Sequence, residues 1–158
     1  IALASVERLL PLARKSNITL STGSLPELPI NGDQHYLGRM MMNLIENAIK
    51  YTSGVGTYVH VELVEKQDKW GVFRVQDDGP GIAEEHLPYL FDRFYRVDKA
   101  RSHGEQHTLP VIDDAKEASG AGLGLSIVQW IVQAHRGEVR VESKMGAGTL
   151  FEVRLPLI

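Results

Sequence analysis

The chain has 158 residues, no cysteine and a formal net charge of −3, and 43% of its residues are hydrophobic. These values are typical of one globular domain, and they exclude a disulfide scaffold, a cysteine-ligated zinc site and a thiol nucleophile. The small net charge gives no field for nucleic acid or an anionic membrane. No apolar run approaches the roughly 18 residues of a membrane span. Because no signal peptide is visible and the sequence begins without methionine, we expect a piece of a larger protein.

Helix and strand periodicities alternate along the chain without internal repeats. Asp33 is a good N-cap for the longest predicted helix, and Gly137 is expected to stop the last one. The predicted elements in chain order are a helix at 1–14, a strand at 17–20, a helix from 34 to about 51, strands at 57–65 and 70–77 joined by a turn at 66–69, a helix at 123–135, and two strands around a turn at 145–149. Together they predict an α/β two-layer sandwich with helices on one face of a mixed, mostly antiparallel sheet.

The longest predicted helix carries a polar stripe. Asn43, Asn47 and Lys50 follow one another at spacings of four and three, within a sector of roughly 60° at the edge of its apolar face. Asparagine is a poor helix-interior residue because its amide competes for the backbone. Helix packing does not require these side chains, so the stripe indicates a polar ligand at a pocket rim. Glu46 lies further from the apolar face, and we expect it to face solvent.

Three glycine-rich segments follow, at 77–82, 119–128 and 146–149. A glycine-rich turn that opens a helix presents free N–H groups to an anion. The chain contains no P-loop motif, and its central cluster reads G-x-G-x-G instead of the dinucleotide fingerprint G-x-G-x-x-G. Turns and caps explain any one cluster. Three of them together with the asparagine stripe indicate a ligand site.

In this combination the sequence resembles the ATP-binding catalytic domain of bacterial sensor histidine kinases, in the GHKL superfamily with its Bergerat fold. The resemblance runs from about residue 2 to residue 156, and its boxes come in the family's order. The matching segments are the N box NLIENAIKYT (43–52), the first glycine box DDGPGI (77–82), the F box LFDRFYR (90–96), the second glycine box GAGLGLSIV (120–128) and the closing GAGTLFEVRLP (146–156). One domain over 1–158 is therefore expected.

The resemblance implies ATP and Mg²⁺ as ligands. The asparagine that matches Asn47 coordinates Mg²⁺ through its amide oxygen, Asn43 lies one turn earlier, and Lys50 and Tyr51 reach the phosphates. The acid that matches Asp77 accepts a hydrogen bond from the adenine amino group. The other implied nucleotide contacts are the lid arginines Arg96 and Arg101, with Gly79, Gly81, Ile82, Phe94, Gly120, Gly122, Leu123, Gly124, Leu125 and Thr149.

The residue at position 43 bears on the reaction. In superfamily members that hydrolyse ATP a glutamate there acts as general base, whereas the amide of Asn43 cannot accept a proton near neutral pH. The resemblance therefore implies transfer of the γ-phosphoryl group to a histidine on a separate dimerisation and phosphoacceptor domain, and from there to a response regulator. Because no phosphoacceptor motif occurs here, we expect the chain alone to bind ATP without autophosphorylation. It is expected to be cytoplasmic, within a parent anchored in the cell membrane.

Two features leave the interpretation open. The expected lid, at about 92–121, contains an insert at 102–119 that is longer than usual for the family. We expect a solvated loop there, although His103, His107, Asp113 and Asp114 could be imagined as metal ligands. The alternative functions are a nucleotide-sensing or interaction module without turnover and a serine kinase of the anti-sigma type, while Asn43 disfavours an autonomous ATPase.

Overall fold

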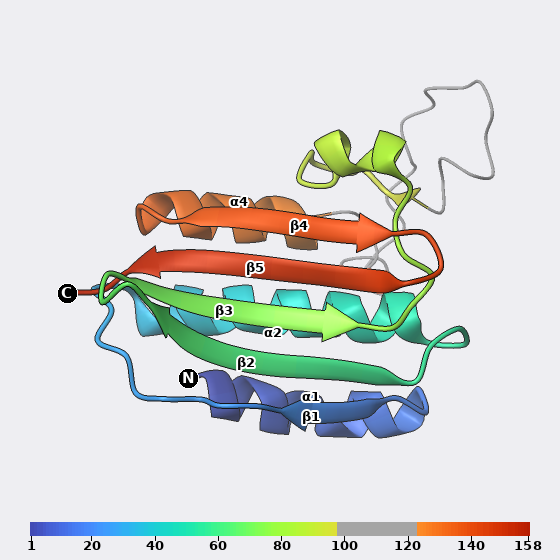
Figure 1. Cartoon of the computed structure of the whole chain (residues 1–158), viewed down its shortest axis with the longest axis horizontal. Helices are drawn as coiled ribbons and strands as arrows, with labels where there is room; N and C mark the ends of the chain where they lie inside the picture. Colours follow the sequence, from blue (N-terminus) through green and yellow to red (C-terminus); the bar gives the residue numbers. More distant parts are fainter. Residues whose placement is uncertain (98–122) are drawn as a thin grey trace.

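The computed structural model of the chain describes residues 1–97 and 123–158. The elements of this part are α1 (Ala2–Lys15), β1 (Thr19–Thr22), α2 (Gln34–Thr52), β2 (Tyr58–Lys66), β3 (Trp70–Asp77), the 3₁₀ helix η1 (Glu84–Tyr89), α4 (Gly124–Ala134), β4 (Glu138–Lys144) and β5 (Gly148–Pro156). In the described ranges, five strands form one sheet in the order β1-β2-β3-β5-β4 (Figure 1). Strand β1 is parallel to β2, and the other neighbouring pairs are antiparallel. The predicted two-layer sandwich with a mixed sheet is confirmed.

The helices α1, α2 and α4 form the second layer, on one face of the sheet (Figure 1). Helix α2 lies in the middle, contacts the other two helices and packs on β2 and β3. Its side chains Met40, Leu44 and Ile45 are fully buried in the same core as Phe73 and Phe151 of the sheet. Each such burial contributes about 1.5–3 kcal/mol. This packing fixes the rotation of α2 and therefore the direction of its polar edge.

The ends of α2 follow from local chemistry. Asp33 is the N-cap, and its carboxylate accepts a hydrogen bond from the Tyr36 N–H at 3.0 Å. This bond satisfies one of the backbone donors that a helix N-terminus leaves unpaired. At the other end the Ser53 N–H donates to the Ile49 carbonyl at 3.0 Å, and the helix ends at Thr52. The N-cap is confirmed, and the predicted end near residue 51 is confirmed to within one residue.

One predicted strand start is wrong, and the last helix ends within one residue of its prediction but closes differently; both involve a left-handed residue. The first strand begins at Thr19 instead of residue 17, because Asn17 adopts a left-handed conformation with φ of +56° and closes α1. Helix α4 ends at Ala134 and is closed by Arg136, with φ of +57°, and not by a left-handed glycine. Gly137 is needed for close packing instead, because a Cβ there would lie 2.3 Å from the Arg154 carbonyl oxygen. Asparagine tolerates the left-handed region better than most residues, whereas arginine bears its steric cost.

The other face of the sheet carries a ladder of alternating charges across four strands. Arg74 on β3 bonds to Glu62 on β2 at 3.0 Å and to Glu152 on β5 at 2.9 Å. Arg154 continues the ladder to Glu152 at 2.6 Å and to Glu138 on β4 at 3.5 Å. Burial alone would raise the pKa of Glu152, but the hydrogen bonds from Arg154 and Arg74 outweigh it and hold the pKa below its ordinary value. Opposite charges on neighbouring strands stabilise this face of the sheet.

Candidate functional site

The polar stripe of α2 lies where the sequence predicts it. Asn43 and Asn47 are half-buried beside the fully buried Leu44 and Ile45, at the edge of the apolar face. The Asn43 amide nitrogen is buried and has no hydrogen-bond partner among the residues that the structure describes. A buried polar atom without a partner costs free energy, so native proteins rarely leave one without a functional reason. This edge of α2 is therefore prepared for a polar group that the protein itself does not supply.

Lys50 and Glu46 pair one helical turn apart. The Lys50 Nζ lies 3.1 Å from a Glu46 carboxylate oxygen, and the two side chains are 39% and 31% exposed. Glu46 is thus partly exposed and ion-paired, and does not simply face solvent as expected. An exposed pair of this spacing contributes only about 0.3–0.5 kcal/mol. Lys50 can therefore exchange Glu46 for a stronger anion at little cost. Its neighbour Tyr51 is half-buried and packs against the core.

Two consecutive aspartates at the end of β3 have different environments. Asp77 is 3% exposed and its carboxylate accepts the Gly79 N–H at 2.9 Å. Burial raises the pKa of Asp77, and the backbone N–H groups of Gly79 and Thr149 offset only part of that effect. The Thr52 hydroxyl lies close enough to lower the pKa slightly as well, but a carboxylate has about four acceptor sites, and these neighbours do not fill them. Asp77 therefore has capacity to accept a hydrogen bond from a ligand.

Asp78 serves the fold. Its carboxylate accepts the Thr57 N–H at 2.8 Å, the Thr57 hydroxyl at 2.7 Å and the Tyr58 N–H at 2.8 Å. Burial alone would raise the pKa of Asp78, but these bonds outweigh it and hold the pKa below its ordinary value. Asp78 thus ties the loop after α2 to the end of β3, and it leaves Asp77 as the acidic group that is available to a ligand.

The loop after Asp77 packs closely on the β4–β5 turn. Gly81 has φ of +75°, and a Cβ there would lie 2.1 Å from the Lys144 carbonyl oxygen, so only glycine fits. The Gly146 N–H donates to the Pro80 carbonyl at 2.9 Å, and Ile82 is buried. The structure therefore explains Gly81 by packing between two loops. A Cβ at Gly79 would instead lie 3.0 Å from the Asp77 carboxylate and 3.1 Å from the Thr52 hydroxyl oxygen.

Sequence reasoning missed two hydroxyl groups near Asp77. The Thr52 hydroxyl is buried, and no described residue makes a hydrogen bond of good geometry to it. The Ser143 hydroxyl lies between Ile82 and Thr149, at 2.7 Å from the Ile82 nitrogen and 2.8 Å from the Thr149 hydroxyl. Thr52 follows directly on the asparagine stripe, which was a usable signal. Ser143 is the last half-buried position of a strand that alternates between exposed and half-buried residues, and only the register of the hairpin places it opposite Thr149.

The two phenylalanines of the F box lie in different environments, one against the core and one at the surface. The Phe91 ring meets Phe151 edge-on, with centroids 6.4 Å apart. Phe94 is 42% exposed, has a φ of +65° and lies 5.7 Å from the Arg93 guanidinium. Phe91 therefore makes an aromatic contact with the sheet, whereas Phe94, which the resemblance implies as a nucleotide contact, lies at the surface. Arg96 is half-buried close to the end of the first described range.

The last predicted nucleotide contacts that the structure describes lie at the start of α4. Leu125 is buried in the core, and the Leu123 carbonyl accepts the Ser126 hydroxyl at 2.8 Å. Gly124 is the first residue of α4. The predicted contacts Arg101, Gly120 and Gly122, and the insert at 102–119, lie outside the described residues.

The residues placed so far meet at one end of the sheet. Figure 1 shows the end of α2, the end of β3, the start of β5 and the end of β4 together on the right of the view. The contacts of Asp77 with Gly79 and Thr149, and the position of Gly79 beside Thr52, agree with this arrangement. The Asp77 carboxylate and the Thr52 hydroxyl lie near each other at this end, where α2, which carries Asn43, Asn47 and Lys50, also ends. Such side chains can accept hydrogen bonds from the donor groups of a base and can hold an anion beside that base.

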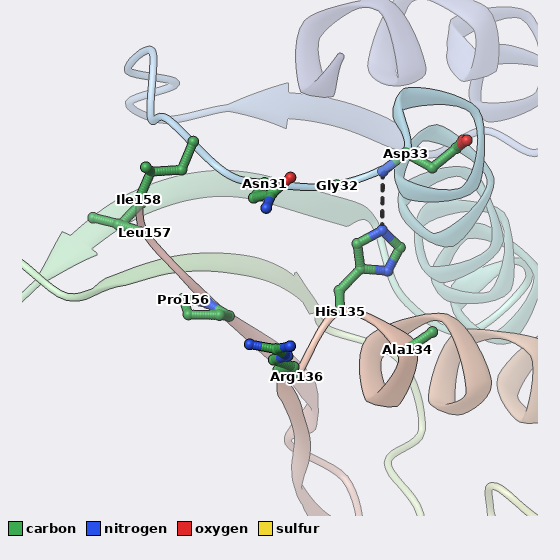
Figure 2. A pocket seen from close by; sticks show the side chains of 9 residues that line it. All are labelled: Asn31, Gly32, Asp33, Ala134, His135, Arg136, Pro156, Leu157 and Ile158. Carbon is green, nitrogen blue, oxygen red and sulfur yellow. Dashed lines mark hydrogen bonds between the residues drawn. The ribbon is translucent and has the colours of Figure 1, made fainter.

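A hollow of about 590 Å³ lies at the opposite end of the domain from Asp77, between residues 31–33, 134–136 and 156–158 (Figure 2). Here His135 links two helices: its Nδ1–H donates to the Ile131 carbonyl at 2.7 Å, and its Nε2 accepts the Asp33 N–H at 3.1 Å. Both ring nitrogens are thus engaged within the protein. We assign this histidine to the fold.

Over residues 1–97 and 123–158, no helix combines the length and the hydropathy needed to cross a bilayer. The same residues contain no cluster of three or more histidine, aspartate or glutamate side chains that could hold a metal ion.

Comparison with known proteins identifies the family. Residues 32–158 match the family described as histidine kinase-, DNA gyrase B- and HSP90-like ATPase. The sensor histidine kinase RppB of Synechocystis sp. is 38% identical over 152 residues, which are 96% of this chain but only 30% of RppB. Full-length ShkA in complex with AMPPNP matches 99% of this chain and 29% of its own, with a TM-score of 0.78 and 26% identity. The mycobacterial sensor histidine kinase MprB matches 98% of this chain and 93% of its own, with a TM-score of 0.74 and 28% identity. The chain therefore belongs to the histidine kinase-, DNA gyrase B- and HSP90-like ATPase family.

Proposed function

We propose that this chain is the catalytic domain of a sensor histidine kinase and binds ATP at the end of the sheet around Asp77. The observation that carries the proposal is the Asp77 carboxylate, which is 3% exposed and whose pKa burial raises despite its protein donors. A buried carboxylate is costly without further donors. The adenine amino group supplies such a donor. The likeness to ShkA, which was solved with the ATP analogue AMPPNP, supports the same ligand.

The asparagine edge of α2 fits a magnesium ion that arrives with the nucleotide. Mg²⁺ keeps several waters and takes only one or two protein oxygens when phosphate oxygens complete its shell. The amide oxygens of the half-buried Asn43 and Asn47 side chains match this modest requirement. Asn47, with Asn43 one turn earlier, would hold the ion. When bound, Mg²⁺ supplies neutralisation of phosphate charge.

The residues of α2 favour transfer to a protein over hydrolysis. Asn43 cannot act as a general base, and Glu46 is paired with Lys50 at 3.1 Å. In the proposed reaction the bond between the γ-phosphorus and its bridging oxygen breaks, a phosphorus–nitrogen bond to a histidine forms, and ADP leaves. Lys50 and Arg96, with Arg101 from outside the described residues, would neutralise the phosphate charge.

The partners follow from the reaction. The acceptor histidine would belong to a dimerisation and phosphoacceptor domain of the parent protein, which would pass the phosphoryl group to a response regulator. RppB, a longer protein, carries a domain similar to this chain. We place the domain in the cytoplasm, where ATP is available, within a parent anchored in the membrane.

Calorimetric titration with AMPPNP and with its guanine counterpart tests the nucleotide assignment. We expect saturable binding of AMPPNP that is stronger with Mg²⁺, and weak binding of the guanine analogue. Equal binding of the two analogues, or no binding, would contradict the proposal. Binding without phosphotransfer to an added phosphoacceptor domain would favour a nucleotide-sensing module.

A further inference from the structure

Ser143, at the end of β4, connects three parts of the proposed site. Its hydroxyl oxygen lies 2.7 Å from the Ile82 nitrogen, 3.1 Å from the Gly148 carbonyl oxygen and 2.8 Å from the Thr149 hydroxyl oxygen. Ile82 belongs to the loop after Asp77, and Thr149 lies opposite Ser143 in the β4–β5 register. One small side chain thus joins the glycine-rich loop after β3 to the first residues of β5.

The number of donors and acceptors on the Ser143 hydroxyl assigns a direction to each of these hydrogen bonds. A serine hydroxyl has one proton to donate and two lone pairs to accept with. The Gly148 carbonyl can only accept, so it takes the Ser143 proton, and the Ile82 N–H occupies one lone pair. The remaining contact is satisfied only if the Thr149 hydroxyl donates to Ser143. Thr149 has then used its proton, and toward any other neighbour its oxygen can only accept.

Thr149 borders the acidic group of the site. It is 7% exposed, lies opposite Asp77 in the β3–β5 register and donates its backbone N–H to the Asp77 carboxylate. We propose that Ser143 is a specificity-determining positioning residue, which holds the Thr149 hydroxyl as an acceptor and so selects a 6-amino purine over a 6-oxo purine. The inference rests on the proposed function, because it assumes that the purine edge meets the Asp77 carboxylate and the Thr149 hydroxyl directly.

The chemistry of the two purines gives the expected discrimination. Adenine presents an amino donor at its 6-position, which suits a carboxylate and a hydroxyl that both accept. A 6-oxo purine in the same pose presents a carbonyl to two acceptors. Without Ser143, the Thr149 hydroxyl can rotate and donate to that carbonyl, which relieves the mismatch. Unpaired polar groups of this kind are the strongest source of discrimination between similar ligands.

The test compares AMPPNP with its inosine counterpart, whose base carries a carbonyl in place of the 6-amino group and a proton on N1. Calorimetry on the parent chain and on Ser143→Ala gives two ratios of dissociation constants. We expect Ser143→Ala to reduce the adenine preference about tenfold, the effect of roughly one hydrogen bond. Ser143→Thr, which keeps the hydroxyl, should restore the preference. Ser21→Ala is the matched control, because that hydroxyl bonds to His60 at 2.8 Å on the other face of the sheet.

A double-mutant cycle with Thr149→Val separates specificity from stability. If Ser143 acts through Thr149, the two changes together reduce the preference no more than Thr149→Val alone. A lower melting temperature with an unchanged ratio would overturn the inference, because Ser143 would then only tie the loops together. If the parent chain itself shows no preference for the adenine analogue, the proposed site is wrong and the inference falls with it. A selective parent and an equally selective Ser143→Ala would refute the inference alone.

Discussion

Replacing Asp77 by asparagine should abolish tight adenine binding without weakening the fold. The side chain is 3% exposed, and burial raises its pKa. An acid whose pKa is higher in the folded state destabilises that state when it is ionised. The cost is fully present above the folded pKa and is relieved as the pH falls through it. Asparagine removes the charge, keeps the shape and can still accept the Gly79 N–H.

The structure sets the expected size of each effect. Removing a buried charge offsets the loss of the Thr149 bond, so at pH 7 we expect the free energy of unfolding to stay constant or to rise by up to about 1 kcal/mol. The variant loses one charge-assisted hydrogen bond to adenine, about 1.5–3 kcal/mol, and can present its amide donor to the adenine amino group. We therefore expect AMPPNP affinity to fall roughly 100-fold.

Chemical denaturation at several pH values, together with calorimetry, checks both effects. The stability difference between variant and parent should shrink as the pH falls through the folded pKa of Asp77. The matched control is Asp78→Asn, which removes an acceptor of three protein hydrogen bonds and should cost roughly 1–2 kcal/mol of stability. If Asp77→Asn binds AMPPNP as the parent does, or if it unfolds as readily as Asp78→Asn, the assignment of Asp77 to the ligand is wrong.

Three further predictions concern single residues. Asn47→Ala should weaken AMPPNP binding when Mg²⁺ is present and change it little in EDTA, because the amide acts through the ion; an equal loss in both titrations would contradict this. Glu152→Gln should lower the free energy of unfolding at pH 7 by about 2 kcal/mol, since it breaks part of a nearly buried charge ladder. The pKa of Glu152 is lowered in the folded state, so this stabilisation is present above the ordinary glutamate pKa and is lost as the pH falls through the folded value. The free energies of unfolding of the parent and of Glu152→Gln should therefore converge below about pH 4, and a difference that stays constant with pH would refute the role of the ladder. Arg136→Gly should raise stability by about 1 kcal/mol, because glycine adopts the observed φ of +57° without strain; a lower melting temperature would count against this account.

The fold was predictable because its signals are local and repeated. The helical spacing of apolar residues in α2 predicted its buried face, and Asp33 predicted where the helix begins. The alternation of apolar and polar residues in β2 and β3 predicted which face of the sheet is covered. The positions of Asn17 and Arg136 were missed because both use the left-handed region, which a propensity argument assigns to glycine first.

The candidate site was predictable only in part. The resemblance assigned the ligand contact to Asp77 instead of Asp78. The structure explains this choice, because the Asp78 carboxylate already accepts three hydrogen bonds from the protein. The pairing of Lys50 with Glu46 depends on side-chain rotamers, which the spacing permits but does not determine. Ser143 depends on the register of a hairpin and on hydrogen-bond directions across the strands, and neither can be read from residue types alone.

The central claim is transfer of a phosphoryl group to a histidine, and γ-labelled ATP tests it most directly. The domain is mixed with the phosphoacceptor domain of its parent and Mg²⁺, and the label is followed on protein and as free phosphate. We expect label on the acceptor domain in an acid-labile, base-stable form, which is typical of phosphohistidine, with little free phosphate from the domain alone. Rapid phosphate release without protein label, or an acid-stable, base-labile adduct, would contradict the account and point to an ATPase or a serine kinase.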